Sequence, residues 1–139
     1  MNRIVNMQPG ESLPPIQLDP VTRLDLIKYA GASGDYNPIH TIDEEAKNAG
    51  LPGIIAHGMW TMGNLAKLFT PYTEEGFIQD YSIRFSGMVF LDEVVTLQAE
   101  LVEKSEGNLH FNVAAVNQQQ KPVMTGQITF STDGWVETA

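Results

Sequence analysis

The sequence predicts an α+β domain, in which a largely helical first half is followed by an antiparallel sheet. Two observations support this fold class. Residues 56–69 are the most apolar segment with helical spacing, and from Phe77 onward apolar and polar residues alternate. The apolar face of such a sheet needs a cover, and only residues 56–69 are apolar enough to provide it. We therefore expect the whole chain, residues 1–139, to form one domain around this helix.

The segment before the apolar helix is interpreted from its prolines and glycines. Residues 7–18 contain three prolines and should be extended. Asp19 and Pro20 predict the start of a helix that Gly31 ends. The apolar face of this helix would consist of Leu24, Ile27 and Ala30, with Leu26 beside it.

Two further helices are predicted before the sheet. Thr41 and Glu44 have the spacing of a capping box, which predicts a short helix over residues 43–49 that Gly50 closes. The apolar helix over residues 56–69 should be buried over much of its girth and should stop at Pro71. Its apolar stripe would consist of Met59, Met62, Leu65 or Ala66, and Phe69.

Four strands are predicted in the second half, each with one apolar face. They cover residues 77–86, 95–101, 109–115 and 124–130. Residues 106–108 and 117–121 are predicted to be hairpin turns. One buried helix followed by four antiparallel strands favours a sheet wrapped around that helix.

The composition excludes several classes of function. Seventeen acidic residues against eight basic ones give a net charge of −9, which excludes nucleic-acid binding and disfavours an anionic membrane surface. The chain has no cysteine, so it cannot use a thiolate nucleophile or a Cys-ligated zinc. Residues 1–15 lack the pattern of a secretory signal, and no apolar stretch is long enough to span a bilayer. We therefore expect a cytoplasmic protein.

The unusual polar residues of the chain gather in the loop 33–40. Asp35 and His40 lie in this loop, and Pro38 stiffens the backbone between them. A carboxylate and an imidazole held together can share one water and exchange its protons. Two other interpretations stay open on spacing alone. Asp35 caps a turn while His40 binds a backbone carbonyl, or Asp35, His40 and His57 hold a metal ion.

A second candidate group stands where the apolar helix begins, at residues 56–58. The first N–H groups of a helix are unpaired and carry positive charge, so they can polarise a thioester carbonyl. Gly58 would allow such an oxygen to approach closely. The alternative is that Gly58 only permits tight packing between the helix and the sheet.

Both groups resemble the R-specific enoyl-CoA hydratases, also called MaoC-like dehydratases. The run Tyr-Ala-Gly-Ala-Ser-Gly-Asp-Tyr-Asn-Pro-Ile-His over residues 29–40 is similar to the signature of that family. The run Ile-Ala-His-Gly-Met over residues 55–59 is similar to its second block. Thr-Met-Gly over residues 61–63 is similar to the catalytic subunit of the mycobacterial 3-hydroxyacyl-thioester dehydratases.

The resemblance implies a hot-dog fold, in which the sheet wraps around the central helix, and a dimer with its sites between two such units. It implies that Asp35 and His40 are the catalytic pair. The Gly58 amide would bind the thioester oxygen, Asn37 would hold the loop, and His57 would belong to the same substrate-binding group.

The chain departs from the family pattern at three positions. Met88 and Leu91 stand where the family usually has proline and glycine, and Gly63 stands where some members have serine. These departures affect the expected shape of the acyl pocket and leave the Asp35–His40 pair untouched.

The residues and the resemblance together predict an enzyme, a hydro-lyase that reversibly hydrates trans-2-enoyl thioesters to (R)-3-hydroxyacyl thioesters. This chemistry needs no metal and no cofactor, and none is expected. The substrate would be an acyl-CoA or an acyl-carrier thioester. In an acidic protein the CoA phosphates would need local basic residues, for which the candidates are Lys47, Lys67, Arg84 and Lys121.

Two other functions stay open at this point. One is a hot-dog thioesterase, in which a carboxylate activates water at the carbonyl. The other is a subunit of a heterodimeric dehydratase that works with a different chain. Because this chain has both Asp35 and His40, it would be the catalytic member of such a pair. Otherwise we expect a homodimer.

Overall fold

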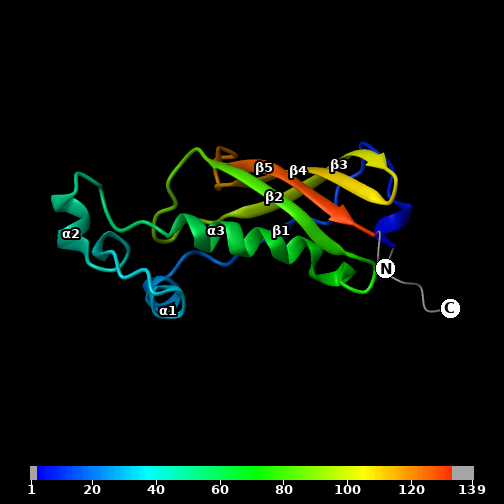
Figure 1. Cartoon of the computed structure of the whole chain (residues 1–139). Helices are drawn as coiled ribbons and strands as arrows, with labels where there is room; N and C mark the ends of the chain where they lie inside the picture. Colours follow the sequence, from blue (N-terminus) through cyan, green and yellow to red (C-terminus); the bar gives the residue numbers. More distant parts are fainter. Residues whose placement is uncertain (1–2, 133–139) are drawn as a thin grey trace.

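A five-stranded antiparallel sheet dominates the computed structural model, which describes residues 3–132 (Figure 1). The order across the sheet is β1-β3-β4-β5-β2. The strands are β1 (Ile16–Gln17), β2 (Phe77–Phe85), β3 (Thr96–Ser105), β4 (Asn108–Val116) and β5 (Pro122–Ser131). The predicted α+β class and its four strands are confirmed, and β1 adds a short strand at one edge of the sheet.

The helical elements fall into two groups. The α-helices are α1 (Arg23–Ser33), α2 (Asp43–Asn48) and α3 (Gly58–Leu65), and the 3₁₀ segments are η1 (Ile4–Asn6), η2 (Pro38–His40) and η3 (Ala66–Tyr72). The helix α3 runs along one face of the sheet (Figure 1). The helices α1 and α2 lie beyond the end of the sheet that is away from both termini.

The core forms where α3 and η3 pack on the sheet. Leu65, Leu68 and Phe69 are at most 3% exposed. The Phe69 ring meets the ring of Phe111 on β4 at a centroid distance of 5.1 Å and that of Phe130 on β5 at 5.8 Å. Burial of each large apolar side chain contributes about 1.5–3 kcal/mol, so this contact fixes the central helix on the sheet.

One polar contact also joins α3 to the sheet. The Tyr81 hydroxyl of β2 donates a hydrogen bond to the Met62 carbonyl at 2.6 Å. Burial raises the pKa of Tyr81 to about 12, so the hydroxyl keeps its proton and remains a donor at neutral pH.

The turns explain why the strands pair in this register. Glu106 and Gly107 connect β3 to β4 with φ angles of 43° and 83°, and two left-handed residues match the twist of a tight hairpin. A register shift between Ile78 and Asp80 on β2 marks a bulge. Because of this bulge Phe77 is 43% exposed while Ile78 packs against the core, which corrects the predicted burial of Phe77.

The predicted boundaries and face of the first helix are wrong. Thr22 caps α1 in a reciprocal capping box with Asp25, so the helix begins after the predicted Asp19 and Pro20. It passes through Gly31 and ends at Gly34, whose φ of 77° is left-handed. The buried residues are Leu26 and Ala30, whereas Leu24 is 57% and Ile27 is 48% exposed.

The predicted capping box of α2 is also wrong. Its N-cap is Ile42, which has no side-chain capping bond, and Thr41 instead ends η2. The Thr41 carbonyl accepts a hydrogen bond from Arg23, whose other nitrogen lies 2.9 Å from Asp43. The Arg23 side chain of α1 therefore holds the start of α2 in place.

The central helix is shorter and less enclosed than predicted. The α-helical part covers only residues 58–65 and continues as a 3₁₀ turn that contains Pro71. Thr61 and Leu65 are its buried residues, whereas Met59 of the predicted stripe is 56% exposed. Among the helices of residues 3–132, none combines the length and the apolar character that crossing a membrane requires.

Candidate active site

The loop between α1 and η2 is held by its own side chains. The hydroxyl of Ser33 accepts from the Asp35 amide at 3.1 Å, and the Asp35 Oδ1 accepts from the Asn37 amide at 3.2 Å. The Asn37 Oδ1 in turn accepts from the Ile39 amide at 3.2 Å and caps η2. Asp35 thus serves its turn with one carboxylate oxygen, as one of the sequence interpretations has it, and its other oxygen is directed elsewhere.

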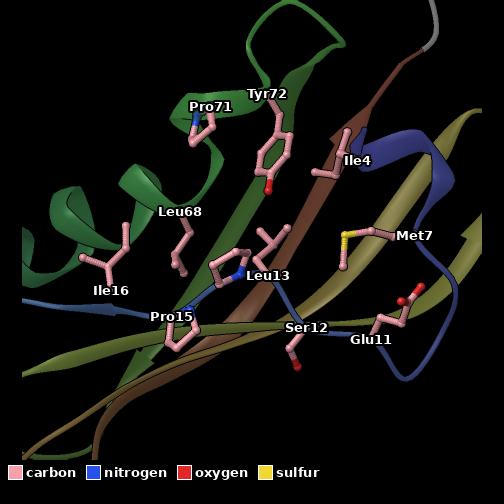
Figure 2. Close-up of a pocket in the computed structure, with 11 residues that line it drawn as sticks. Ile4, Met7, Glu11, Ser12, Leu13, Pro15, Ile16, Leu68, Pro71 and Tyr72 are labelled. Carbon is pink, nitrogen blue, oxygen red and sulfur yellow. The ribbon is translucent and has the colours of Figure 1, made fainter. Parts of the chain in front are cut away.

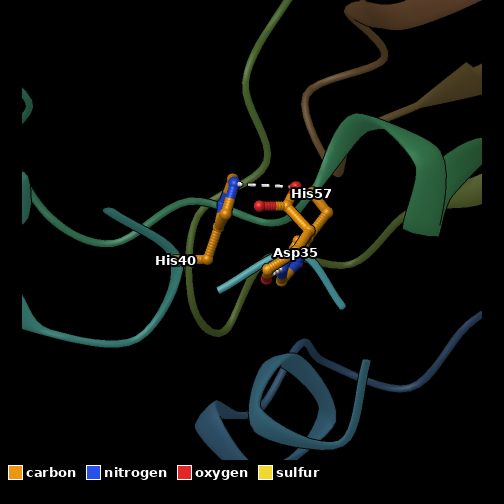
Figure 3. A group of neighbouring side chains, drawn as sticks. All are labelled: Asp35, His40 and His57. Atoms are coloured by element: carbon orange, nitrogen blue, oxygen red, sulfur yellow. Dashed lines mark hydrogen bonds and ion pairs between the residues drawn. The ribbon is translucent and has the colours of Figure 1, made fainter. Parts of the chain in front are cut away.

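That other oxygen faces His40. The Asp35 Oδ2 lies 3.9 Å from the His40 Nε2. A dashed line in Figure 3 marks this pair. The His40 Nδ1 donates to the Ile55 carbonyl at 2.7 Å, and a carbonyl only accepts, so the neutral ring keeps Nε2 as an acceptor. The distance from the Asp35 Oδ2 to the His40 Nε2 is longer than a direct hydrogen bond, and two acceptors that face each other suit a water that donates to both. The Asp35 side chain is 52% exposed, which leaves this position open to solvent.

His57 packs against the His40 ring and is itself buried. Its ring is 2% exposed and stacks on the His40 ring at a centroid distance of 3.8 Å. Its Nε2 donates to the Asp35 backbone carbonyl at 3.2 Å. A ring this covered offers little surface to a substrate, and the place of His57 in the substrate-binding group stays a prediction.

The three side chains considered for a metal do lie together. Each of Asp35, His40 and His57 offers one ligand atom, and these atoms lie within 4.8 Å of one another (Figure 3). One nitrogen of each ring is already bonded to a backbone carbonyl, and Asp35 is bonded within its own turn. These contacts suit a pair that holds water and equally suit a metal site, so removal of metal ions by a chelator is needed to separate the two interpretations.

Gly58 is the first residue of α3 and borders a cavity of about 160 Å³. We call this the His40 cavity; its lining includes His40, Ala56, Gly58, Thr61, Phe85 and Met88. A Cβ on Gly58 would lie 2.9 Å from the Phe85 Cε1, so the ring of β2 packs directly on the glycine. Gly58 therefore serves close packing, and its helix-start amide also lies beside the cavity that His40 lines.

A larger cavity of about 430 Å³ lies elsewhere, between the N-terminal segment and η3 (Figure 2). We call it the Tyr72 cavity; its lining includes Ile4, Leu13, Pro15, Ile16, Leu68 and Tyr72. Its described lining contains none of the residues predicted for the site.

Sequence reasoning missed three contributors. The Ile55 carbonyl sets the His40 tautomer, and a backbone oxygen leaves no signal in a residue pattern. Tyr29 meets the His57 ring edge-on at 4.8 Å, although it was noted only as part of the signature. The alternation over residues 77–86 places Phe85 on the apolar face of its strand, whereas the structure shows it 50% exposed and packed on Gly58.

The basic residues considered for CoA phosphates lie at separate places on the surface. All four are exposed: Lys47 on α2, Lys67 on η3, Arg84 on β2 and Lys121 just before β5. Arg84 directly precedes Phe85, which lines the His40 cavity.

Comparison with known proteins identifies this combination of fold and loop. The structure resembles that of the R-hydratase PhaJ1 from Pseudomonas aeruginosa, with a TM-score of 0.83 at 22% identity over 91% of this chain and 83% of that one. The expected hot-dog fold is thereby confirmed. The family model described as MaoC like domain matches residues 5–123, and the chain belongs to this family.

Two relatives of known function are much longer than the part that this chain matches. It is 33% identical over 99 residues to the peroxisomal enoyl-CoA hydratase 2 of Arabidopsis thaliana, covering 69% of this chain and 31% of that protein. It is 34% identical over 94 residues to the fatty acid synthase beta subunit TOXC of Cochliobolus carbonum, covering 66% of this chain and 4% of that protein. The chain thus spans a third or less of these two relatives.

Proposed function

We propose that this chain is a hydro-lyase that reversibly adds water to trans-2-enoyl thioesters and yields (R)-3-hydroxyacyl thioesters. The observation that carries the proposal is the pair of side chains Asp35 and His40, of which His40 lines the His40 cavity. The Asp35 Oδ2 and the His40 Nε2 face each other at 3.9 Å, and Gly58 at the start of α3 lines the same cavity.

In the proposed step Asp35, His40 and Gly58 each have a distinct role. Water bound between Asp35 and His40 gives a proton to the Asp35 carboxylate while its oxygen forms a bond to C3 of the substrate. The electrons of the C2–C3 double bond move onto the thioester oxygen, where the Gly58 amide stabilises the negative charge. The pair then returns a proton to C2, so one water is consumed and the catalytic groups are regenerated.

The tautomer of His40 suits this step. Because Nδ1 is bonded to the Ile55 carbonyl, Nε2 can accept a hydrogen bond from the water and orient its lone pair. Family membership and the relative named enoyl-CoA hydratase 2 support the same reaction for this chain. The acyl donor is a CoA or acyl-carrier thioester. The reaction neither gains nor loses electrons, so it requires no redox cofactor.

A homodimer is part of the proposal. The strand β2 pairs with β5 on one side only and forms an edge of the sheet. Phe77 and Phe85 on this strand and Met59 on α3 are 43%, 50% and 56% exposed. Such apolar side chains beside an unpaired edge favour association with a second copy, with a different partner chain as the alternative. Native mass measurement of the purified chain separates the two.

Cytoplasmic location remains a proposal from the sequence.

The reaction is tested with the purified chain and crotonyl-CoA. We expect loss of the enoyl absorbance without release of free thiol, since hydration leaves the thioester intact. Release of thiol in step with the loss of substrate would instead identify a thioesterase, and the proposal would then be wrong.

A further inference from the structure

We propose that His57 is a positioning residue that holds the Asp35 backbone and the His40 ring in their working arrangement while it remains a neutral imidazole. The inference rests on the proposed function, because the arrangement matters for hydration. His57 itself is buried and does not line the His40 cavity. Its effect must therefore pass through Asp35 and His40.

The first argument is a reciprocal pair of hydrogen bonds between two chain segments. His40 of the loop donates to the Ile55 carbonyl at 2.7 Å, and His57, two residues after Ile55, donates back to the Asp35 carbonyl at 3.2 Å. The Ile55 amide also donates to the Ile39 carbonyl at 3.2 Å. Each histidine thus ties its own segment to the backbone of the other, and loss of either bond frees the loop.

The second argument is the stacking of the rings. The His57 ring lies 3.8 Å from the His40 ring at 23°, and 4.8 Å from the Tyr29 ring at 61°. The His57 ring is therefore held between α1 and His40. A fixed support on one side of His40 prevents its ring from tilting, and this keeps Nε2 aimed at the Asp35 Oδ2.

The third argument comes from the helix start. His57 is the N-cap of α3, a position where serine, threonine, aspartate or asparagine normally bonds the first amides. Its side chain makes no capping bond to α3 and is used instead on the loop. A residue chosen for the helix alone would have a different side chain.

The charge of His57 follows from its surroundings. Among the described residues, the titratable side chains that face His57 are Tyr29 of α1, Asp35 of the loop and His40 of η2. Since Nε2 carries the donated hydrogen, Nδ1 is an acceptor, and this atom is buried with no hydrogen-bond partner. A second proton there would lack an acceptor and would stand beside His40. Burial lowers the pKa of His57, and the neighbouring His40 lowers it further, against the opposing effect of the Asp35 carbonyl and carboxylate.

Two variants test the hydrogen-bond donor and the aromatic ring of His57 separately. His57→Phe keeps a flat ring under His40 and loses the donor, whereas His57→Gln keeps an amide donor near the Nε2 position and loses the ring. We expect His57→Phe to lower kcat by about tenfold or more with KM within about twofold, because misplaced catalytic groups slow the step and leave binding intact. His57→Gln should recover part of that loss.

The matched control is His110→Gln. His110 lies on β4 and bonds Ser105 and Thr129, away from the loop, so its removal should leave kcat unchanged. If folded His57→Phe keeps wild-type kcat, or loses activity only through KM, the positioning role is wrong.

A measurement on the unaltered chain decides the matter even if a variant does not fold. Imidazole nitrogen shifts from NMR should show His40 with its hydrogen on Nδ1 and His57 with its hydrogen on Nε2. On acidification, His57 should take up a proton only below the pH at which an ordinary histidine does, since burial lowers its pKa. The opposite tautomer on His57, or protonation of His57 at or above the ordinary histidine pH, would overturn the proposal. This result does not depend on any substrate, so it remains distinct from failure of the proposed hydration.

Discussion

The Tyr72 cavity and the His40 cavity show that volume and chemistry are set by different features of this chain. The Tyr72 cavity is larger, about 430 Å³ against about 160 Å³, and arises where the N-terminal segment passes over η3. Among its described lining residues, Glu11 is the one carboxylate, and there is no histidine. The His40 cavity lies where two segments remote in sequence exchange hydrogen bonds through their histidines. The proposed catalytic groups therefore lie where two chain segments exchange hydrogen bonds, and not in the larger of the two cavities.

The largest effect is expected from the pair beside the smaller cavity. Asp35→Asn and His40→Gln should each lower kcat/KM for crotonyl-CoA by about 10²-fold or more, because proton transfer to and from the water is lost. Asp19→Asn, which changes an exposed carboxylate outside both cavities, serves as control. If either Asp35→Asn or His40→Gln kept a near wild-type rate, the reaction would not depend on this pair, and the contrast between the two cavities would be wrong.

A smaller effect is expected where Phe85 packs on Gly58. Gly58→Ala places a Cβ 2.9 Å from the ring and forces it to move, so kcat/KM should fall by about tenfold as the cavity changes shape. Phe85→Leu in the same chain should restore part of the rate by making room. Gly31→Ala on α1, where the new Cβ meets nothing within 4 Å, is the matched control. Equal losses in both alanine variants would argue against a role for this contact.

In the larger cavity a conservative change should have little effect on catalysis. Tyr72→Phe removes the hydroxyl that points into the space in Figure 2. We expect kcat/KM within about twofold of wild type, because the described lining of this cavity contains none of the proposed reacting groups. A large loss of activity in the folded variant would show that the Tyr72 cavity takes part in the reaction.

Removal of metal ions should have the smallest effect. Dialysis against EDTA should leave kcat/KM unchanged if Asp35 and His40 hold a water and His57 positions them, as proposed. Loss of activity that Zn²⁺ restores would instead support the three-donor metal alternative.

The sequence predicted the parts of the site that depend on local chemistry. Asp35 and His40 could be singled out because a proline-stiffened loop carries both, and Asn37, which was expected to hold this loop, caps η2. The strands were predicted because one-sided burial produces alternation, as β3 shows over residues 97–101.

The remainder depends on long-range contacts that leave little trace in a sequence. The stacking of His57 on His40 joins residues whose proximity only the tertiary fold creates. The face of α1 was mispredicted because Leu24 and Ile27 are apolar yet exposed, so composition alone could not show which side is buried. Thr22 was missed as the cap of α1 because Asp19 and Pro20 offered a second plausible start.

The most direct test of the central claim follows the added water itself. Crotonyl-CoA is incubated with the chain in ¹⁸O-labelled water, and the product is analysed by mass and on a chiral column. We predict (R)-3-hydroxybutyryl-CoA with one ¹⁸O atom at C3, and formation of this product at a rate lower by about 10²-fold or more with Asp35→Asn. The S enantiomer, label in a free crotonate carboxylate, or equal product from Asp35→Asn would contradict a shared water activated by Asp35 and His40.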